Sequence, residues 1–206
     1  MSLTLLALFV PTFFFVSITP GMCMLLSLSL GMTIGVRKTM YMMFGELLGV
    51  ALVACAAALG VAALMLKLPQ LFIVLKLGGG AYLIWLGYQM WCSRGRLVLR
   101  DADAEQPAPS PRELALNGFV TAVANPKGWV FLLTLLPSFL DVSKAMAPQL
   151  TAMVAVMVVI EFSALMIYAS GGKALRHLLL NKHNVRLMNR ISGSLMIAVG
   201  LWLALG

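Results

Sequence analysis

Charged residues are scarce in this chain. Only 11% of the 206 residues are charged, and seven acidic residues stand against fifteen Lys and Arg. Hydrophobic residues make up 61% of the chain, and the mean hydropathy is +0.97. Because no soluble core needs so much apolar surface, the composition excludes an ordinary soluble domain. It predicts an all-α integral membrane protein with several spans.

Cysteines and catalytic signatures are also few. Cys23, Cys55 and Cys92 lie within or at the end of apolar stretches and form no CxxC pair, so we expect buried structural thiols. The sequence has no HExxH, GxSxG or P-loop motif. His177 and His183 have no intramembrane acidic cluster beside them, which makes a poor metal site. We therefore expect no enzyme, no metal and no cofactor.

The apolar residues fall into six stretches, each able to cross a hydrocarbon core that requires about 20 helical residues. They cover residues 3–34, 39–66, 69–92, 113–140, 146–170 and 188–206. The first stretch has no Lys or Arg before its apolar run and no small-x-small cleavage site after it. We expect it to remain in the membrane and not to be removed as a signal peptide.

The basic residues are concentrated in alternate loops. Eleven of the fifteen Lys and Arg fall in loops 35–38, 93–112 and 171–190. The positive-inside rule makes these loops cytoplasmic and places both termini on the periplasmic or exterior side. The net charge of +8 thus indicates topology and not nucleic-acid binding.

Two of the predicted spans are interrupted by proline. The interruptions are Thr19-Pro20-Gly21 in the first span and Asn125-Pro126-Lys127 in the fourth. Proline removes a helical N–H and clashes with the carbonyl four residues earlier, here that of Val16 or Ala122. Lipid offers no water to loose backbone groups, so each break must be stabilised by protein or face a polar cavity. A matched pair of broken segments indicates the binding site of a secondary transporter.

The chain divides into two similar halves, residues 1–92 and 113–206, joined by a charged, proline-containing linker at 93–112. Each half begins with a broken span. The third span of each half carries two glycines seven residues apart, Gly80 and Gly87, then Gly193 and Gly200. With three spans per half, the second half enters from the opposite side. The sequence therefore predicts two inverted three-helix repeats, which let one site open alternately to two sides.

Two GxxxG patterns, at residues 31–35 and 45–49, allow close approach of helices. Such patterns are common in apolar sequence, so they allow a homodimer but do not predict a specific dimer face.

Three charged side chains lie well inside the predicted spans. A cation at the bilayer centre costs at least ~2.5–3.5 kcal/mol on insertion scales, so we expect Lys127 to face a partner or a wet cavity. It could bind a substrate carboxylate or neutralise a coupling carboxylate; the alternatives are a structural ion pair and snorkelling. Glu46 and Glu161 are candidates for exchanging a proton or holding an ammonium. A structural pair with Lys127, or solvation of Glu46 near the interface, is the alternative.

The residues around both breaks are candidate substrate ligands. Unwound backbone at Gly21, with the Thr19 hydroxyl and the Asn125 amide, can bind both ends of a zwitterion. The helices that restart after Pro20 and Pro126 present N-termini that favour a carboxylate. The simpler alternative is that the two prolines only kink the helices for packing.

Five segments carry a family resemblance that covers nearly the whole chain. They are Ile18-Thr19-Pro20-Gly21, GELLG at 45–49, LKLGGGAYLIWLG at 75–87, Asn125-Pro126-Lys127-Gly128-Trp129 and Leu136-Pro137-Ser138-Phe139. They resemble the LysE/RhtB superfamily of bacterial amino-acid exporters. The resemblance implies a six-span protein of the bacterial inner membrane that exports amino acids or close derivatives and is coupled to the proton gradient. It also implies that the Pro20 and Pro126 breaks line the substrate path. The family usually has a second proline after the glycine of the first break, and Met22 in its place implies a more apolar pocket edge.

The leading hypothesis is proton-coupled export of an amino acid or similar metabolite by alternating access. A membrane thiol–disulfide electron carrier has a comparable plan, but it would need a cysteine by each break, and only Cys23 meets this condition. A third class is a non-transporting membrane partner protein, although scaffold helices have little reason to retain Lys127 at the midplane. The sequence does not give the substrate, the coupling ion or the oligomeric state.

Overall fold

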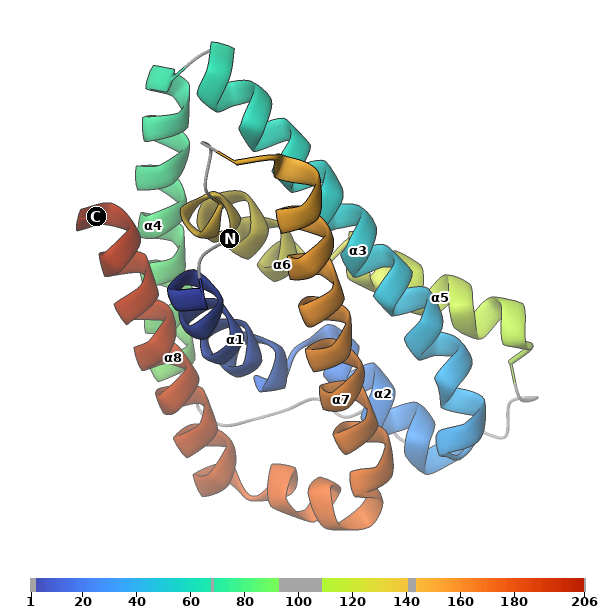
Figure 1. Ribbon diagram of the computed structural model, residues 1–206. Coiled ribbons are helices and arrows are strands. Elements are labelled where there is room, and N and C mark those ends of the chain that lie inside the picture. Colours follow the sequence, from blue (N-terminus) through green and yellow to red (C-terminus); the bar gives the residue numbers. More distant parts are fainter. Residues whose placement is uncertain (1–2, 68, 93–108, 141–143, 206) are drawn as a thin grey trace.

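The computed structural model describes residues 3–67, 69–92, 109–140 and 144–205, and its regular elements there are all helical, as predicted (Figure 1). The elements are α1 (Leu3–Ile18), α2 (Met22–Thr33), α3 (Val36–Lys67), α4 (Pro69–Cys92), α5 (Pro111–Val123), α6 (Pro126–Leu135), the 3-10 helix η1 (Leu136–Phe139), α7 (Met146–Leu180) and α8 (Lys182–Leu205).

Length and hydropathy single out a few of these helices as membrane spans. Within the described residues, Val36–Gly60 of α3 and Met146–Gly172 of α7 are long and apolar enough to cross a bilayer. The bent pair α1 and α2 makes a third candidate if it is counted as one span. The division into six spans therefore stays a prediction.

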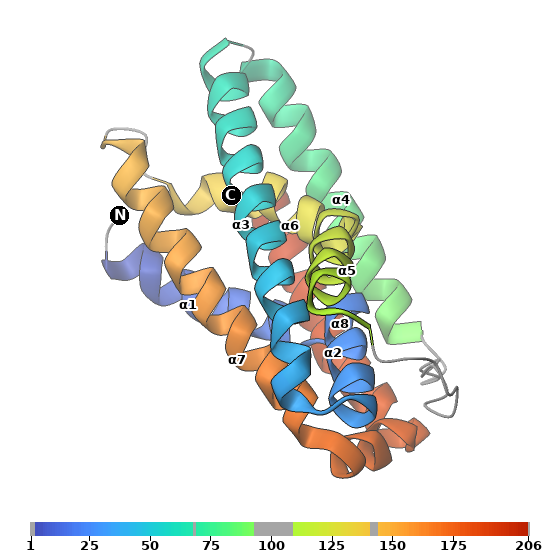
Figure 2. The ribbon, with the colours of Figure 1, turned by 90° about the vertical axis from the view of Figure 1, so that its right-hand side faces the viewer.

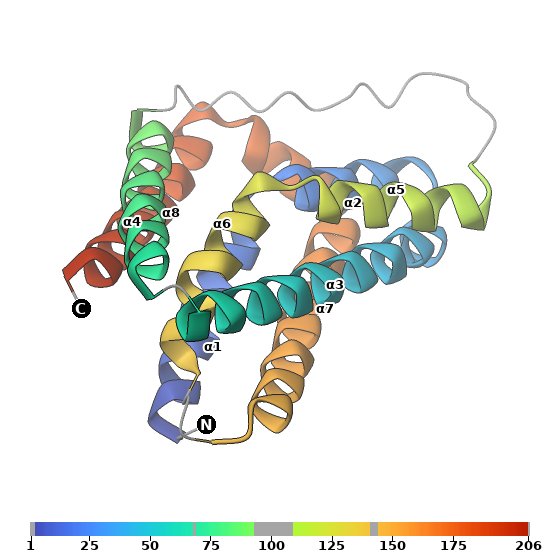
Figure 3. The same ribbon diagram turned by 90° about the horizontal axis from the view of Figure 1, so that it is seen from above.

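Both predicted breaks interrupt a helix. At the first, α1 ends at Ile18, α2 begins at Met22, and the two axes differ by 55°. At the second, α5 ends at Val123 and α6 begins at Pro126, where proline occupies the first helical turn and lacks only an N–H that has no helical partner there. Figures 2 and 3 show how each pair changes direction at its break.

The segment 171–190, predicted as a loop between two spans, is helical, although the candidate span before it ends at Gly172, close to the predicted bound. Helix α7 continues to Leu180 through a kink at Gly172, where φ of +45° lies in the left-handed region, and α8 already begins at Lys182. The apolar run does end near residue 170, but Lys, Arg and Leu are good helix formers, so the backbone helix outlasts the hydropathy signal. His177 and His183 are thus helical residues.

The other two predicted loops are shortened or undescribed. The loop at 35–38 reduces to Gly35, whose φ of +81° lets α2 turn directly into α3. Residues 93–108 of the predicted linker lie outside the described residues. The linker's last residues belong to α5, where Ser110 and Glu113 form a reciprocal capping box.

Helices α4 and α8 pack antiparallel against each other, side by side in Figures 1 and 3. Glycine allows this approach. A Cβ on Gly87 would lie 2.6 Å from the Gly193 carbonyl oxygen, and a Cβ on Gly193 would lie 2.5 Å from that of Gly87. Gly80 and Gly200 meet in the same reciprocal way, at 3.0 and 2.7 Å. The repeated glycine pair of each half thus faces the pair of the other half.

Helices α3 and α5 also meet through glycine, and one GxxxG pattern serves this contact. A Cβ on Gly45 would lie 1.8 Å from the Ala115 carbonyl oxygen, and Gly49 lies against Phe119 and Ala122. From the α5 side, Gly118 lies against the backbone of Met42 and Glu46. The pattern at 45–49 therefore packs within the chain and leaves no exposed glycine face for a second copy there.

We predict that Gly118→Ala separates α3 from α5, because the added methyl group would lie 2.0 Å from the Met42 carbonyl oxygen and 2.9 Å from the Glu46 nitrogen. Overpacking of this kind costs about 1–3 kcal/mol. Thermal unfolding of the detergent-purified protein measures the loss. Gly60→Ala is the matched control, because nothing lies within 4 Å of its added methyl group. Equal melting temperatures for the two variants would contradict the packing argument.

Candidate functional site

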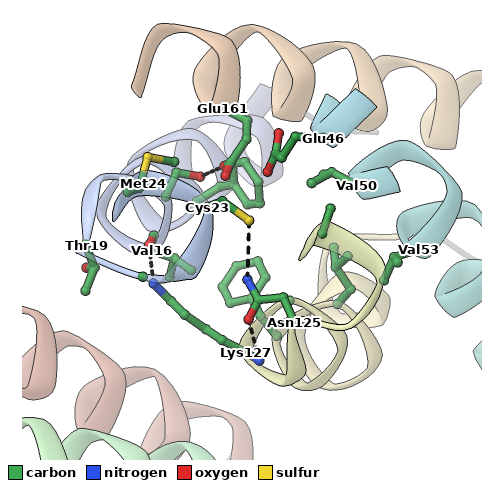
Figure 4. Close-up of a pocket in the computed structure, with 17 residues that line it drawn as sticks. Val16, Thr19, Cys23, Met24, Glu46, Val50, Val53, Asn125, Lys127 and Glu161 are labelled. Atoms are coloured by element: carbon green, nitrogen blue, oxygen red, sulfur yellow. Dashed lines mark hydrogen bonds between the residues drawn. The ribbon is translucent and has the colours of Figure 1, made fainter. Parts of the chain in front are cut away.

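A cavity of about 70 Å³ lies where the two helix breaks approach each other (Figure 4). Its apolar walls come from two core clusters, with Phe13, Val53 and Phe131 in one and Cys23 and Met24 in the other. Its polar lining consists of Ser17, Thr19, Glu46, Asn125, Lys127 and Glu161. Polar residues more than one hundred positions apart in the sequence thus line one cavity.

The end of α1 is held by side chains that bond its last carbonyls. Pro20 has no N–H, so the Val16 carbonyl loses its helical donor, and the Lys127 ammonium donates to it at 2.7 Å. The Tyr168 hydroxyl of α7 donates to the Ile18 carbonyl at 2.9 Å. The Thr19 hydroxyl donates to the Phe15 carbonyl at 2.6 Å. The predicted requirement that protein satisfy the loosened backbone is met at this break.

The second break satisfies its own backbone. The Asn125 N–H donates to the Ala122 carbonyl at 3.2 Å, which replaces the bond that Pro126 cannot make. The Trp129 indole donates to the Val123 carbonyl at 2.7 Å. The Asn125 carboxamide oxygen caps α6 by accepting from the Lys127 N–H at 3.1 Å. All of these partners lie within a few residues of the proline.

The two glutamates occupy the same cavity with different partners. Glu161 on α7 is 8% exposed and accepts a hydrogen bond from the Ser17 hydroxyl. Glu46 on α3 is fully buried, and neither of its carboxyl oxygens has a hydrogen-bond partner. The two carboxyls interact electrostatically, and Figure 4 shows both directed toward the cavity from the side opposite Lys127. In the described part of the chain, Lys127 forms no salt bridge with either one.

Most of the predicted site residues line this cavity. Thr19, Gly21, Glu46, Asn125, Lys127 and Glu161 do so, whereas Pro20 and Pro126 create the breaks without lining it. Met22 is 51% exposed and does not line the cavity. The expectation that Met22 makes the pocket edge more apolar is therefore wrong, because α2 directs it outward and presents Cys23 instead.

Sequence reasoning missed several polar partners. Ser17 bonds Glu161, Ser192 of α8 shares a 2.8 Å hydrogen bond with Thr19, and Tyr168 caps α1. One signal could have found Tyr168: it lies seven residues after Glu161, on the same face of a helix. The hydroxyl partners carry no comparable signal, because nothing local distinguishes them from other serines in apolar helices.

Comparison with known proteins gives a consistent pattern. The signature of the family described as LysE type translocator matches residues 14–206. The homoserine/homoserine lactone efflux protein of Salmonella typhimurium is 26% identical over 91% of this chain and 90% of its own length. The leucine efflux protein of Enterobacter sp. is 33% identical, covering 63% of this chain and 61% of its own length. The threonine efflux protein of Salmonella typhi is 36% identical, covering 46% and 47%. No solved structure matches significantly.

We predict that Tyr168→Phe destabilises the protein, because it leaves the half-buried Ile18 carbonyl without its donor. An unsatisfied buried polar group costs about 1–3 kcal/mol. Thermal unfolding in detergent, compared with wild type, measures the change. The matched control is Tyr41→Phe, since Tyr41 is 47% exposed and should tolerate the loss of its hydroxyl. A Tyr168→Phe protein as stable as the control would show that the hydrogen bond does not hold α1.

Proposed function

The chain belongs to the LysE-type translocator family, and from that premise we propose that it exports an amino acid or a close derivative across the bacterial inner membrane. Members of the family are multi-pass membrane proteins that act as efflux transporters and not as enzymes. The efflux relatives are named for homoserine, homoserine lactone, leucine and threonine. A small compound with a free amino group is the chemistry common to these substrates.

One observation carries the proposal most directly: the cavity has a cation on one side and an unpartnered carboxyl on the opposite side. Lys127 approaches from α6, and Glu46 approaches from α3. An amino acid carries a carboxylate and an ammonium that match these two groups. A cavity for uncharged solutes would need neither charge, and buried charges destabilise a protein unless they are paired.

Two inverted three-helix repeats, residues 1–92 and 113–206, are the architecture we propose, with six spans. The reciprocal glycine contacts between α4 and α8 support this, because a two-fold relation pairs Gly80 with Gly200 and Gly87 with Gly193 at once. The basic segments at 35–38, 93–112 and 171–190 then face the cytoplasm, and both termini face the exterior.

Alternating access would operate at the Lys127–Val16 contact. The substrate carboxylate competes with the neutral Val16 carbonyl for the Lys127 ammonium, and a charged acceptor forms the stronger bond. Release of Val16 removes one of the three side-chain bonds that hold the end of α1, which is already separated from α2 by the first break. The cavity is small, about 70 Å³, and such a movement would enlarge it around the substrate.

Proton coupling completes the proposed cycle, with Glu46 and Glu161 as the groups that take up and release the proton. They are the acids of the cavity lining, and proton relays in membranes are built from buried carboxyls of this kind. Thr19, Gly21 and Asn125 would supply the remaining polar contacts to the substrate, and Pro20 and Pro126 would keep the backbone open beside it.

Purified protein in liposomes tests the function directly. Vesicles loaded with unlabelled L-homoserine, L-threonine or L-leucine should accumulate the same labelled amino acid by counterflow. An imposed pH gradient should drive net movement. If none of a broad amino-acid and dipeptide panel moves, the proposal fails and a non-transporting partner protein becomes the better account.

We predict that Lys127→Ala abolishes counterflow while the protein still inserts in the membrane. Hydrogen bonds to charged groups contribute about 1.5–3 kcal/mol, so substrate affinity should fall about 10- to 100-fold. Lys182→Ala removes an equal charge from an exposed position and should transport normally. Membrane fractionation checks insertion of both variants. Normal counterflow by Lys127→Ala would remove this residue from the mechanism.

A further inference from the structure

Glu46 carries two acceptor atoms that the described structure leaves without a donor. The residue is fully buried, both carboxyl oxygens are unpartnered, and the side chain faces the cavity. Buried polar groups in proteins almost always have a hydrogen-bond partner, and an unpaired carboxylate is among the most costly exceptions. Such a group calls for a donor that enters the cavity.

The groups around Glu46 do not provide a positive partner. Glu161 on α7 is a second acid, already bonded to Ser17. The Cys23 thiol on α2 interacts with Glu46 but is only a weak S–H donor, and the Asn125 amide nitrogen lies 4.0 Å from the sulfur. Lys127 donates to the Val16 carbonyl. When both interacting carboxyls are ionised, they and the one ammonium leave the cavity one negative charge in excess, which a proton or a cation on the carboxyl pair removes.

The missing partner must be small, positive and rich in N–H donors. A primary ammonium meets all three conditions, because it is compact and offers three donors. A planar guanidinium is larger and suits a more open site. A metal ion fits less well, because no cluster of three or more His, Cys, Asp or Glu side chains exists among the residues that the structure describes. The acidic side of the cavity therefore selects for an amine head group.

We propose that Glu46 and Glu161 form the subsite for the primary ammonium of the exported compound, and that a proton occupies the same carboxyl pair when the ammonium leaves. This inference rests on the proposed function. One bound ammonium is replaced by one proton, so the charge of the site is conserved and no covalent bond of the substrate changes. Substrate and proton are coupled because they compete for one site, without a separate proton relay.

The two ends of the cavity then bind different groups of the substrate. The carboxyl pair requires a charged amino group, and Lys127 recognises the carboxylate. An amino-acid amide keeps the amino group and loses the carboxylate, so it should still bind. An N-acetyl amino acid keeps the carboxylate and loses the cation, so it should be rejected.

The first test compares these analogues on full-length purified protein. The probe is whichever of L-homoserine, L-threonine and L-leucine shows counterflow, together with its amide and its N-acetyl derivative as competitors. The N-acetyl compound should compete about 100-fold more weakly than the amide, because it leaves the buried acids without a cation. Equal competition by the two analogues would overturn the ammonium subsite. Absence of counterflow with every amino acid would instead overturn the proposed function.

The second test measures binding of the same amino acid at several pH values. If one proton competes with the ammonium, the affinity for the amino acid should fall about tenfold for each unit by which the pH is lowered, once the carboxyl pair begins to take up its proton. Glu46→Gln should weaken binding and remove this pH dependence. Glu113→Gln is the matched control, because it makes the same chemical change at an exposed position and glutamine preserves the capping box. Affinity that varies with sodium concentration and not with pH would overturn the shared proton site.

A third measurement does not depend on a folded Glu46 variant. A hydrophobic carbodiimide should modify Glu46 or Glu161 in the wild-type protein, with the modified residue identified by mass spectrometry. The amino acid and its amide should both protect the carboxyls, whereas the N-acetyl compound should not. Protection by the N-acetyl compound alone would contradict the assignment of the amine to this side of the cavity.

Discussion

The hydrogen bond from the Lys127 ammonium to the Val16 carbonyl holds the site together. Pro20 makes this bond necessary, since it deprives a carbonyl of its helical donor in a region where lipid supplies none. The donor comes from the other half of the chain, so the bond fixes the two breaks at a set distance. The cavity is the space that remains between them.

The same bond also determines which charged groups in the cavity are left without a salt-bridge partner. Because Lys127 is engaged with a neutral carbonyl, it forms no salt bridge with Glu46 or Glu161 among the described residues, although its charge acts on Glu161, and Glu46 stays without a hydrogen-bond partner. A direct Lys127–Glu46 pair would have closed the site with an internal salt bridge that needed no ligand. Holding the opposite charges apart leaves both able to bind a zwitterion. The structural ion pair that the sequence allowed is therefore not the arrangement adopted.

The breaks and the charged lining residues could be predicted from sequence because the lipid bilayer constrains them strongly. A proline or charge within an apolar run has few structural solutions in lipid, so the breaks and the lining residues Lys127 and Glu46 could be found locally. The Thr19–Ser192 and Ser17–Glu161 bonds depend on how helices cross and rotate, which no local pattern records. The direction of Met22 depends on the first turn of α2 and was mispredicted for that reason. Hydropathy located the apolar span of α7 up to its kink at Gly172, but it gives no signal for the polar helical residues that follow.

The two breaks differ in where their backbone carbonyls find hydrogen-bond donors, and this difference affects which break can move. At the second break every replaced bond stays between residues 120 and 129, so α5 and α6 can shift as one unit while their own backbone groups at this break stay bonded. At the first break the carbonyls of Val16 and Ile18 depend on α6 and α7. Any displacement of α1 must exchange those donors for others. A substrate carboxylate that takes Lys127 forces such an exchange at Val16, so the energetic link between binding and rearrangement lies at the end of α1.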